Sequence, residues 1–367
     1  MQDKVYLVLE CRLCQNKNLK KVITLAKNPI GDRFFADIKV AKNCELHNVE
    51  IMLCQNCGQM QLSEVIEPKE IYTEDYLYTT GTSVGLIEHY RRSAKDIVEQ
   101  FHLPKNSFIV EIGSNEGAML KAFCELGMQV LGIDPASISV QIAQKQGVET
   151  WCGFFNLEMA QKIVSIKGKA SIVIANNVIA NIPSLVDIVK GIGMLLDSKG
   201  VLVFETSYAQ SVLKHHLIDT IYHEHISYFS LKPLAMFFKN QGLELFDAQE
   251  IETKGGSLRG YVAKPLCFSK TKRLEELMKS EDSFIFASHI VANSVDFEVL
   301  FKEVKQLLGE KEEFIFESFY AKAVLENNLL DMVFQEHLNY LFLAPLCKFL
   351  EKRSLNLYDA KLINSKG

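Results

Sequence analysis

The chain has 367 residues, of which 48% are hydrophobic and 23% charged, a composition typical of a globular protein with room for two or three domains. Its formal charge of −5 and its pI of about 6.0 argue against a surface for nucleic acid or for an anionic membrane. No apolar run approaches the roughly 18–20 residues that span a bilayer. The first residues lack the basic start and the long apolar stretch of a signal peptide. We therefore expect a cytoplasmic protein, whose nine cysteines should be thiols or metal ligands in reducing surroundings.

Two CxxC pairs lie near the N-terminus, Cys11 with Cys14 and Cys54 with Cys57, and 39 residues separate them. A CxxC turn directs both sulfurs toward one centre, and two such turns complete the shell of four thiolates that structural zinc prefers. The alternatives are an accidental pair or a redox CxxC, but the latter needs a single pair in a thioredoxin-like unit. We expect a structural zinc, because four thiolates leave no open position for chemistry.

A helix, a strand, a glycine-rich turn and a second strand follow in that order. Apolar residues recur at helical spacing from 86 to 98. The apolar strand 107–112 then leads into the turn Gly113–Gly117, which opens another helix. The next strand, 130–134, ends in Asp134, 21 residues after Gly113. This order predicts a nucleotide site at the carboxyl edge of a parallel sheet, with the acid bonding ribose hydroxyls.

The turn itself separates two cofactor classes that share this geometry. A dinucleotide needs GxGxxG, so that a helix N-terminus can meet the pyrophosphate. Here Gly113 and Gly117 are spaced as GxxxG, and Glu111 precedes them. An acid beside the turn suits S-adenosylmethionine, which has no phosphate and carries a cationic amino-acid tail. We therefore expect a methyl donor; a dinucleotide or a tight turn without a ligand are the alternatives.

The chain continues as alternating strands and helices. The strand from residue 170 ends in the two carboxamides Asn176 and Asn177, at the edge where a ligand would lie. Residues 185–196 are predicted to form a helix and 200–205 another strand. The alternation predicts an α/β fold with a doubly wound parallel sheet and right-handed crossovers.

Titratable side chains gather between two of these strands. They are His215, His216, Tyr222, His223, Glu224, His225 and Tyr228. The alternation in HEH would place His223 and His225 on one face of a strand, as in a metal site, but no third ligand is evident. Surface histidines are a second interpretation. The third is a general base, because histidine titrates near neutral pH and can take a proton from a bound substrate.

In this order the motifs resemble those of one specific family. The motifs are the two cysteine pairs, EIGSNEG at 111–117, NNVIANIP at 176–183, IYHEHISYFS at 221–230 and KGGSLRGYVA at 254–263. From about residue 11 to 263, the chain resembles S-adenosylmethionine-dependent sugar C-methyltransferases, which act on nucleotide-linked keto-deoxysugars. The resemblance implies a class I methyltransferase-like Rossmann fold and a small N-terminal zinc-binding domain.

The resemblance also implies roles for individual residues. It implies that His225 removes the proton from the carbon next to the sugar ketone, and that Tyr76, Tyr222 and Glu224 lie in the sugar pocket. It implies a structural zinc at Cys11, Cys14, Cys54 and Cys57. The implied donor contacts are Gly113, Ser114, Asn115, Gly117, Asp134, Asn176 and Asn177. To these we add Glu111, the acid that precedes the turn. These parts agree with the chemistry, since a carbon must become an enolate before it can attack a methyl sulfonium.

The chain departs from the family pattern in three places. Glu116 replaces the aspartate that is usual in the turn, and Asn181 stands where many relatives carry a histidine, so a second acid–base role there would be lost. The glycine-rich C-terminal domain of the relatives has no counterpart. Instead, residues 283–367 align without gaps onto 171–255 at an offset of 112, with about a third of the 85 pairs identical.

The repeat has two interpretations. It is a remnant that packs as a half-sheet, or it supplies a pseudo-symmetric surface that closes the sugar-nucleotide site. Glu336 and His337 recur in a copy without a donor turn, which indicates that part of the Glu224–His225 pattern serves the fold.

We expect three domains: zinc-binding (1–72), methyl-donor-binding (73–262) and a partial repeat (263–367). The predicted function is methyl transfer from S-adenosylmethionine to carbon of a nucleotide-activated keto-deoxysugar, by a monomer or homodimer. The alternatives are O- or N-methyl transfer, or a non-catalytic binding protein.

Overall fold

The computed structural model describes residues 5–31, 36–72, 79–83, 85–215, 217–281, 284–288, 290–308, 313–329, 333 and 338–362. Four residues named above, Tyr76, His216, Glu336 and His337, lie outside these ranges. The chain divides into two compact units, Met1–Met278 and Lys279–Gly367. Within the described ranges, no helix is both long and apolar enough to cross a membrane.

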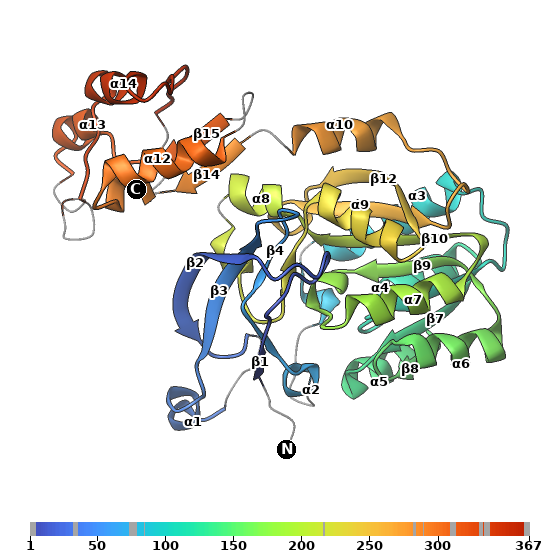
Figure 1. Cartoon of the computed structure of the whole chain (residues 1–367). Helices are drawn as coiled ribbons and strands as arrows, with labels where there is room; N and C mark the ends of the chain where they lie inside the picture. The colour runs from blue at the N-terminus through green and yellow to red at the C-terminus, as the bar shows by residue number, and fades with distance from the viewer. Residues whose placement is uncertain are drawn as a thin grey trace. The chain divides into compact units, whose positions relative to one another are not determined.

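A small antiparallel sheet forms the N-terminal lobe of the first unit (Figure 1). Its strands, in spatial order, are β11 (Ser227–Tyr228), β4 (Met60–Leu62), β3 (His47–Cys54) and β2 (Leu19–Asn28). The lobe also contains the pair β1 (Val5–Leu7) and β5 (Glu64–Ile66), and the short helices α1 (Ile38–Lys42) and α2 (Pro68–Ile71). Because β11 comes from a later part of the chain, it ties the lobe to the central domain. Val49 and Ile51 of β3 pack with Tyr228 in a shared apolar core.

Seven strands form the central sheet in the order β12-β13-β10-β9-β6-β7-β8. They are β6 (Phe108–Ile112), β7 (Gln129–Asp134), β8 (Thr150–Cys152), β9 (Ala170–Asn176), β10 (Leu196–Ser207), β12 (Glu244–Ile251) and β13 (Ser257–Ala263). Neighbouring strands are parallel except at β13, which is antiparallel to both β10 and β12. The chain order reverses between β6 and β9, and ligands of doubly wound sheets bind in the crevice at such a point. The predicted fold class is confirmed.

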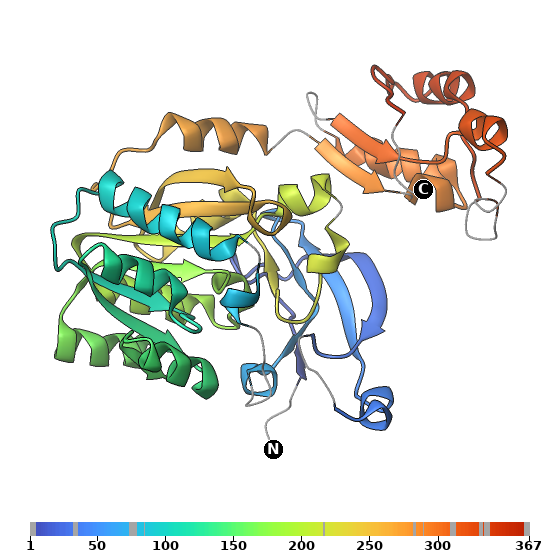
Figure 2. The same ribbon diagram turned by 180° about the vertical axis from the view of Figure 1, so that it is seen from behind.

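Helices cover both faces of this sheet, as the two opposite views show (Figures 1 and 2). One face packs on α3 (Leu86–Gln100), α4 (Ala118–Glu125) and α5 (Ser137–Lys145). The other packs on α6 (Leu157–Lys167), α7 (Leu185–Leu195) and α9 (Leu231–Asn240). The remaining elements of the unit are α8 (Ala209–Lys214), α10 (Lys272–Ser280), η1 (Thr80–Thr82), η2 (Ile179–Asn181), η3 (Ile218–Thr220) and η4 (Thr253–Gly255). Burial on both faces explains why β6 and β9 are almost continuously apolar.

The second unit has the local structure of part of the first. Its strands β14 (Phe284–Ser288) and β15 (Glu313–Glu317) are parallel, and Phe284 lies opposite Glu313 just as Ile172 lies opposite Val201 in β9 and β10. The helices α11 (Ile290–Asn293), α12 (Phe297–Leu307), α13 (Ala321–Glu326) and α14 (Leu343–Glu351) lie 112 residues after η2, α7, α8 and α9, to within one residue. The described part of this unit contains no counterpart of β6 or its turn. The predicted domain boundaries after residues 72 and 262 stay predictions.

Candidate active site

The four cysteines of the two CxxC pairs converge on one point. Their Sγ atoms all lie within 4.8 Å of one another, and the Cys11–Cys57 and Cys14–Cys54 distances are both 3.6 Å. A tetrahedron with Zn–S bonds of about 2.3 Å has sulfur–sulfur edges of about 3.8 Å, so the thiolates fit a zinc ion. Among the described residues this is the only group of three or more potential metal ligands.

Arg12, inside the first CxxC turn, connects this site to the central domain. Its guanidinium donates to the carbonyl oxygens of Ile182 and Pro183, at 3.1 Å for Pro183, and to the Oγ atom of Ser227 at 2.8 Å. Burial lowers the pKa of Arg12 to about 10, which leaves it charged at neutral pH. The cysteine turn therefore holds the segment Ile182–Pro183 through a half-buried cation.

The glycine-rich turn after β6 is shaped by three left-handed residues, Gly113 (φ 69°), Asn115 (φ 46°) and Gly117 (φ 80°). A Cβ atom on Gly113 would also lie only 2.4 Å from the side chain of Val178, so this position has no room for another residue. The N–H of Asn115 in this turn donates to Oδ2 of Asp134 at 2.8 Å. The turn and the acid at the end of β7 are thus in direct contact.

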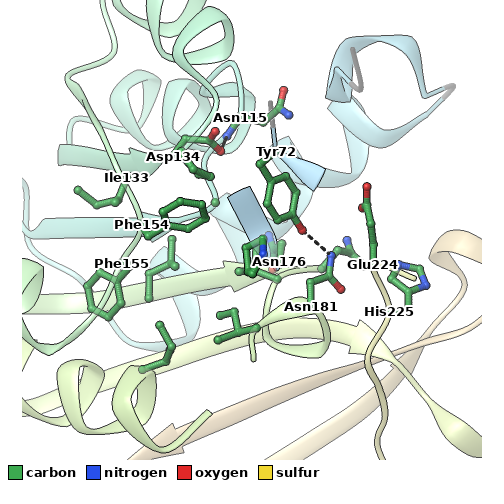
Figure 3. Close-up of a pocket in the computed structure, with 18 of the residues that line it drawn as sticks. Tyr72, Asn115, Ile133, Asp134, Phe154, Phe155, Asn176, Asn181, Glu224 and His225 are labelled. Carbon is green, nitrogen blue, oxygen red and sulfur yellow. Dashed lines mark hydrogen bonds between the residues drawn. The ribbon is translucent and has the colours of Figure 1, made fainter. Parts of the chain in front are cut away.

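One cavity runs along this edge of the sheet (Figure 3). Its empty volume of about 1150 Å³ includes space that is open to solvent. Of the predicted donor residues, it is lined by Gly113, Asn115, Asp134, Asn176 and Asn177, and not by Glu111, Ser114 or Gly117. The carboxyl group of Glu111 is only 3% exposed within β6, and burial raises its pKa well above the usual range.

We call the end of the cavity that Gly113 and Asn115 line the donor end. Two polar side chains there are buried and line the cavity. The carboxyl group of Asp134 is 6% exposed, and burial raises its pKa even though two backbone N–H groups donate to it. The amide nitrogen of Asn176 is buried without a hydrogen-bond partner among the described residues. Buried polar groups nearly always have a partner, so a ligand that accepts a hydrogen bond from Asn176 fits this position.

Apolar side chains complete the donor end. Ile133, Phe154 and Phe155 lie beside Asp134 (Figure 3). An aromatic ring beside a ribose-binding acid suits the stacking of an adenine base. The sequence analysis did not single out the two phenylalanines, because they lie in a loop after β8 that has no motif of its own.

At the other end of the cavity, His225 is held in one tautomer. Its Nδ1 atom lies 2.8 Å from the carbonyl oxygen of Thr220, which can only accept, so Nδ1 carries the proton. The Nε2 atom is then the basic atom, and it lies 3.4 Å from the hydroxyl of Tyr222. Burial lowers the pKa of His225 to about 4, with a smaller effect from the charge of Lys254. His225 is therefore a neutral imidazole at pH 7.

The neighbouring histidine has different surroundings. His223 is buried, and its ring lies edge-on to that of His47, 5.6 Å away, in the N-terminal lobe. It does not line the cavity, whereas Glu224 and His225 do. The HEH sequence therefore lies in a turn rather than on a strand, and its two imidazoles do not face a common point.

Tyr72 and Asn181 form a contact that the sequence analysis did not foresee. The side-chain amide of Asn181 donates to the hydroxyl of Tyr72 at 3.4 Å, between the donor end and Glu224 (Figure 3). Burial raises the pKa of Tyr72, so its hydroxyl keeps its proton. Tyr72 ends the last helix of the N-terminal lobe and immediately precedes residues 73–78, which include Tyr76 and lie outside the described residues.

Glu116 links the donor turn to the segment after residue 78. Its two carboxylate oxygens accept the backbone N–H groups of Thr80, at 3.0 Å, and Gly81, at 2.6 Å. Glu116 is 8% exposed and Thr80 6%, so water competes weakly for these bonds. Thr80 itself lines the cavity.

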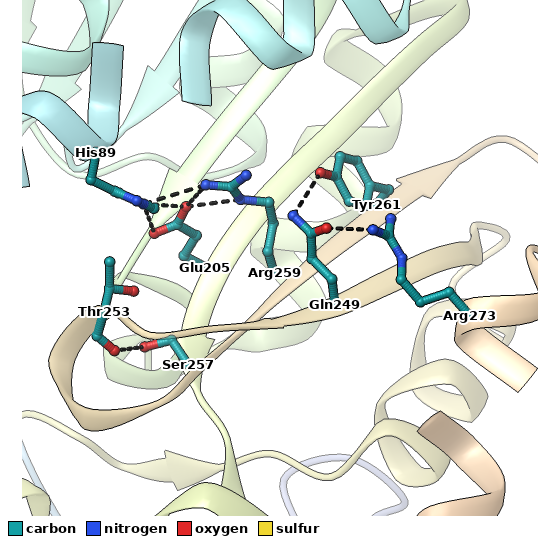
Figure 4. Close-up of polar contacts among 8 residues, drawn as sticks. All are labelled: His89, Glu205, Gln249, Thr253, Ser257, Arg259, Tyr261 and Arg273. Carbon is teal, nitrogen blue, oxygen red and sulfur yellow. Dashed lines mark hydrogen bonds and ion pairs between the residues drawn. The ribbon is translucent and has the colours of Figure 1, made fainter. Parts of the chain in front are cut away.

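A buried ion-pair network lies where β10 ends, next to Asn176 (Figure 4). The carboxylate of Glu205 lies 2.9 Å from Nε2 of His89 in α3 and accepts two N–H groups of Arg259 in β13, at 2.6 and 2.9 Å. Glu205 and Arg259 are 1% and 4% exposed. The network fixes α3 to the sheet underneath the cavity.

Two domain families match the chain. Residues 11–72 match a family described as "Putative zinc binding domain", and residues 86–248 match a methyltransferase domain family. The chain carries a methyltransferase domain behind a zinc-binding domain. A curated relative, the C-methyltransferase NovU of Streptomyces niveus, is 33% identical over 263 residues. That alignment covers 72% of this chain and 62% of NovU, so the chain spans less than two thirds of the length of this relative. The expected resemblance to C-methyltransferases is thereby confirmed.

Solved structures are similar at low identity. A magnesium protoporphyrin IX methyltransferase from Synechocystis PCC 6803 is 17% identical with a TM-score of 0.38, covering 49% of this chain and 84% of that one. An S-adenosylmethionine-dependent methyltransferase from Clostridium acetobutylicum is 11% identical with a TM-score of 0.39, covering 48% and 92%.

Proposed function

We propose that the protein transfers a methyl group from S-adenosylmethionine to a carbon of a nucleotide-activated keto-deoxysugar. The observation that carries the proposal is that one cavity joins a donor end, with Asp134 and Asn176, to an end with a neutral, oriented imidazole, His225. Carbon methylation requires both parts, a donor and a base beside an acidic C–H group. The match to a C-methyltransferase supports the same reaction class.

The chemistry of the donor end suits S-adenosylmethionine. Asp134 would accept the ribose hydroxyls, Phe154 or Phe155 would stack on the adenine, and the unsatisfied amide of Asn176 would donate to the amino-acid part. The bound donor supplies an electrophilic methyl group on a sulfonium. A dinucleotide suits the turn less well, because GxxxG has Asn115 where GxGxxG has the glycine that lets the backbone approach a pyrophosphate.

At the acceptor end, we assign His225 as the base that removes the proton next to the ketone. Its Nε2 atom carries the basic lone pair, which faces the hydroxyl of Tyr222 at 3.4 Å, since Nδ1–H donates to the Thr220 carbonyl. Tyr222, whose hydroxyl lies beside Nε2, and Tyr76 would donate to the enolate oxygen, and Glu224 would bind a sugar hydroxyl. Asn181 would hold Tyr72 rather than exchange protons.

The cysteine cluster is proposed to hold zinc for stability. Four thiolates fill the coordination shell, so the ion would take no part in methyl transfer.

The test is turnover on a panel of nucleotide keto-deoxysugars with S-adenosylmethionine, followed by mass spectrometry for the gain of one methyl group. Carbon chemistry further predicts exchange of the C–H proton with solvent deuterium in the absence of the donor. Methylation without such exchange, with the new methyl group on oxygen or nitrogen, would instead indicate the O- or N-methyltransferase alternative.

A further inference from the structure

The hairpin between β12 and β13 carries a lysine in an unusual backbone conformation. Lys254 lies in η4 with φ 52° and ψ 37°, in the left-handed region that side chains other than glycine rarely adopt. The carbonyl of Thr253 holds the turn, because it accepts the N–H of Gly256 at 3.0 Å and the hydroxyl of Ser257 at 2.9 Å (Figure 4). Non-glycine residues in this region cost about 1–3 kcal/mol and cluster at ligand-binding positions.

Neighbouring side chains also pack closely against the two glycines of this turn. A Cβ atom on Gly255 would lie 2.9 Å from Leu217, and one on Gly256 would lie 2.8 Å from the Cβ of Ser211 in α8. Because both glycines are pressed against neighbouring side chains, the hairpin cannot shift without repacking. Lys254 is therefore presented from a fixed backbone.

Lys254 lines the acceptor end of the cavity, together with Tyr222 and His225. Of the described residues that line the cavity, it is the only lysine or arginine, and the two carboxylates there are Asp134 and Glu224. The charge of Lys254 is close enough to His225 to contribute to lowering its pKa. A single positive charge thus stands beside the proposed base, at the end of the cavity away from Asp134.

An acceptor with an anionic group needs such a charge. In a nucleotide-activated sugar, the diphosphate is attached directly to the sugar ring, so it lies within one ring of any reacting carbon. The net charge of the protein is −5, and the other charged side chains among the described residues that line the cavity are the carboxylates Asp134 and Glu224. Lysine binds phosphate as a point charge that can reach several oxygens.

We propose that Lys254 binds the diphosphate of the acceptor and so selects nucleoside-diphosphate-linked substrates over uncharged ones. This inference rests on the proposed function for the identity of the acceptor. The recognition step itself needs only a phosphate anion, so it can be tested without turnover.

The test is binding of inorganic pyrophosphate to the full, zinc-loaded chain, measured by calorimetry at constant ionic strength. Loss of a charged hydrogen bond, about 1.5–3 kcal/mol, predicts that Lys254→Gln weakens binding by about tenfold to a hundredfold. Lys254→Arg should keep most of the affinity, because it keeps the charge. Lys239→Gln, on the exposed end of α9, is the matched control and should bind like the unchanged protein.

Binding of S-adenosylhomocysteine should be the same in all three variants, which shows that the fold and the donor end are intact. The inference is overturned if the unchanged chain does not bind pyrophosphate, or if Lys254→Gln binds it equally well while remaining folded. With a keto-sugar nucleotide that is turned over, Lys254→Gln should raise KM at least about tenfold with kcat little changed. Pyrophosphate binding through Lys254 without methylation of any keto sugar would contradict the proposed function but leave the anion site in place. Methylation with an unchanged KM would contradict the anion site alone.

Discussion

Glu116 in the donor turn accepts the backbone N–H of Thr80 at 3.0 Å, across 36 positions of sequence. The second carboxylate oxygen accepts the N–H of Gly81. One side chain of the donor-binding turn therefore fixes the segment that follows residues 73–78, in which Tyr76 lies. We expect the acceptor side of the cavity to depend on Glu116 although this residue does not line it.

Replacing Glu116 by glutamine should release this segment. An amide has one acceptor oxygen, and its NH₂ group would face the second backbone donor, so at least one bond is lost at a cost of about 1–3 kcal/mol. Hydrogen exchange of the Thr80 and Gly81 amides should accelerate by about tenfold or more, which mass spectrometry of the peptide can measure. Glu125→Gln, on the exposed end of α4, is the control. Equal protection in both variants would contradict the role of Glu116.

Replacing His225 by glutamine should abolish methyl transfer and leave donor binding unchanged. General bases contribute about 10²–10⁴-fold to rate, so turnover should fall by at least two orders of magnitude. Calorimetry with S-adenosylhomocysteine reports on folding and on the donor end. Substitution of the exposed His102 is the control. Activity that survives in His225→Gln would refute the assignment of the base.

The buried imidazole of His225 also makes stability depend on pH. Its pKa is lowered by burial to about 4, from the usual 6.5, so the unfolded chain binds this proton at higher pH than the folded one. The resulting stabilisation is complete above about pH 6.5, is lost as the pH falls toward 4, and amounts to about 3 kcal/mol. The difference in unfolding free energy between the unchanged protein and His225→Gln, from urea titrations, should grow by this amount between acid and neutral pH. A difference that does not vary with pH would contradict the burial of a neutral ring.

Removing the metal should destabilise the first unit. The thiolates bring the two cysteine turns together around one ion, so chelation should lower the melting temperature and expose four reactive thiols. Cys57→Ser should lose bound zinc, measured by elemental analysis, whereas Cys124→Ser, at an exposed cysteine outside the cluster, should keep it. Full zinc occupancy in Cys57→Ser would contradict the site.

The variant Arg12→Met tests whether the metal site supports the cavity through Arg12. The variant keeps all four cysteines but removes the donors to Ile182 and Pro183, both of which line the cavity. We expect unchanged zinc content, a loss of stability of about 1–3 kcal/mol from the lost hydrogen bonds, and a higher KM for the acceptor. Unchanged acceptor kinetics would show that the zinc lobe stabilises the fold without shaping the cavity.

Local signals allowed much of this architecture to be predicted. The strand before Gly113 and the one ending in Asp134 are short apolar runs, and the glycine spacing requires a tight turn, so both follow from neighbouring residues. The convergence of the cysteines follows from ligand chemistry, because two CxxC turns suit one ion.

The contacts that complete the site could not be predicted in this way. Arg12 meets Ile182 and Pro183 some 170 positions away, and no periodicity encodes such a pairing. Glu111 precedes the turn and was predicted as a donor contact; it is buried within β6 and does not line the cavity, so this contact stays a prediction. The sequence places Lys254 in a motif and gives it no role, because only the fold shows that it is the one lysine or arginine among the described residues that line the cavity.

The second unit copies β9 through α9 together with their parallel register, but in its described residues it lacks the strand that would precede a glycine turn. In the central sheet, the nucleotide cleft lies between its first strand, β6, and its fourth, β9. The described part of the copy has a counterpart of β9, namely β14, but none of β6. Each polypeptide should accordingly saturate with a single equivalent of S-adenosylhomocysteine in an equilibrium titration, however closely its two halves correspond.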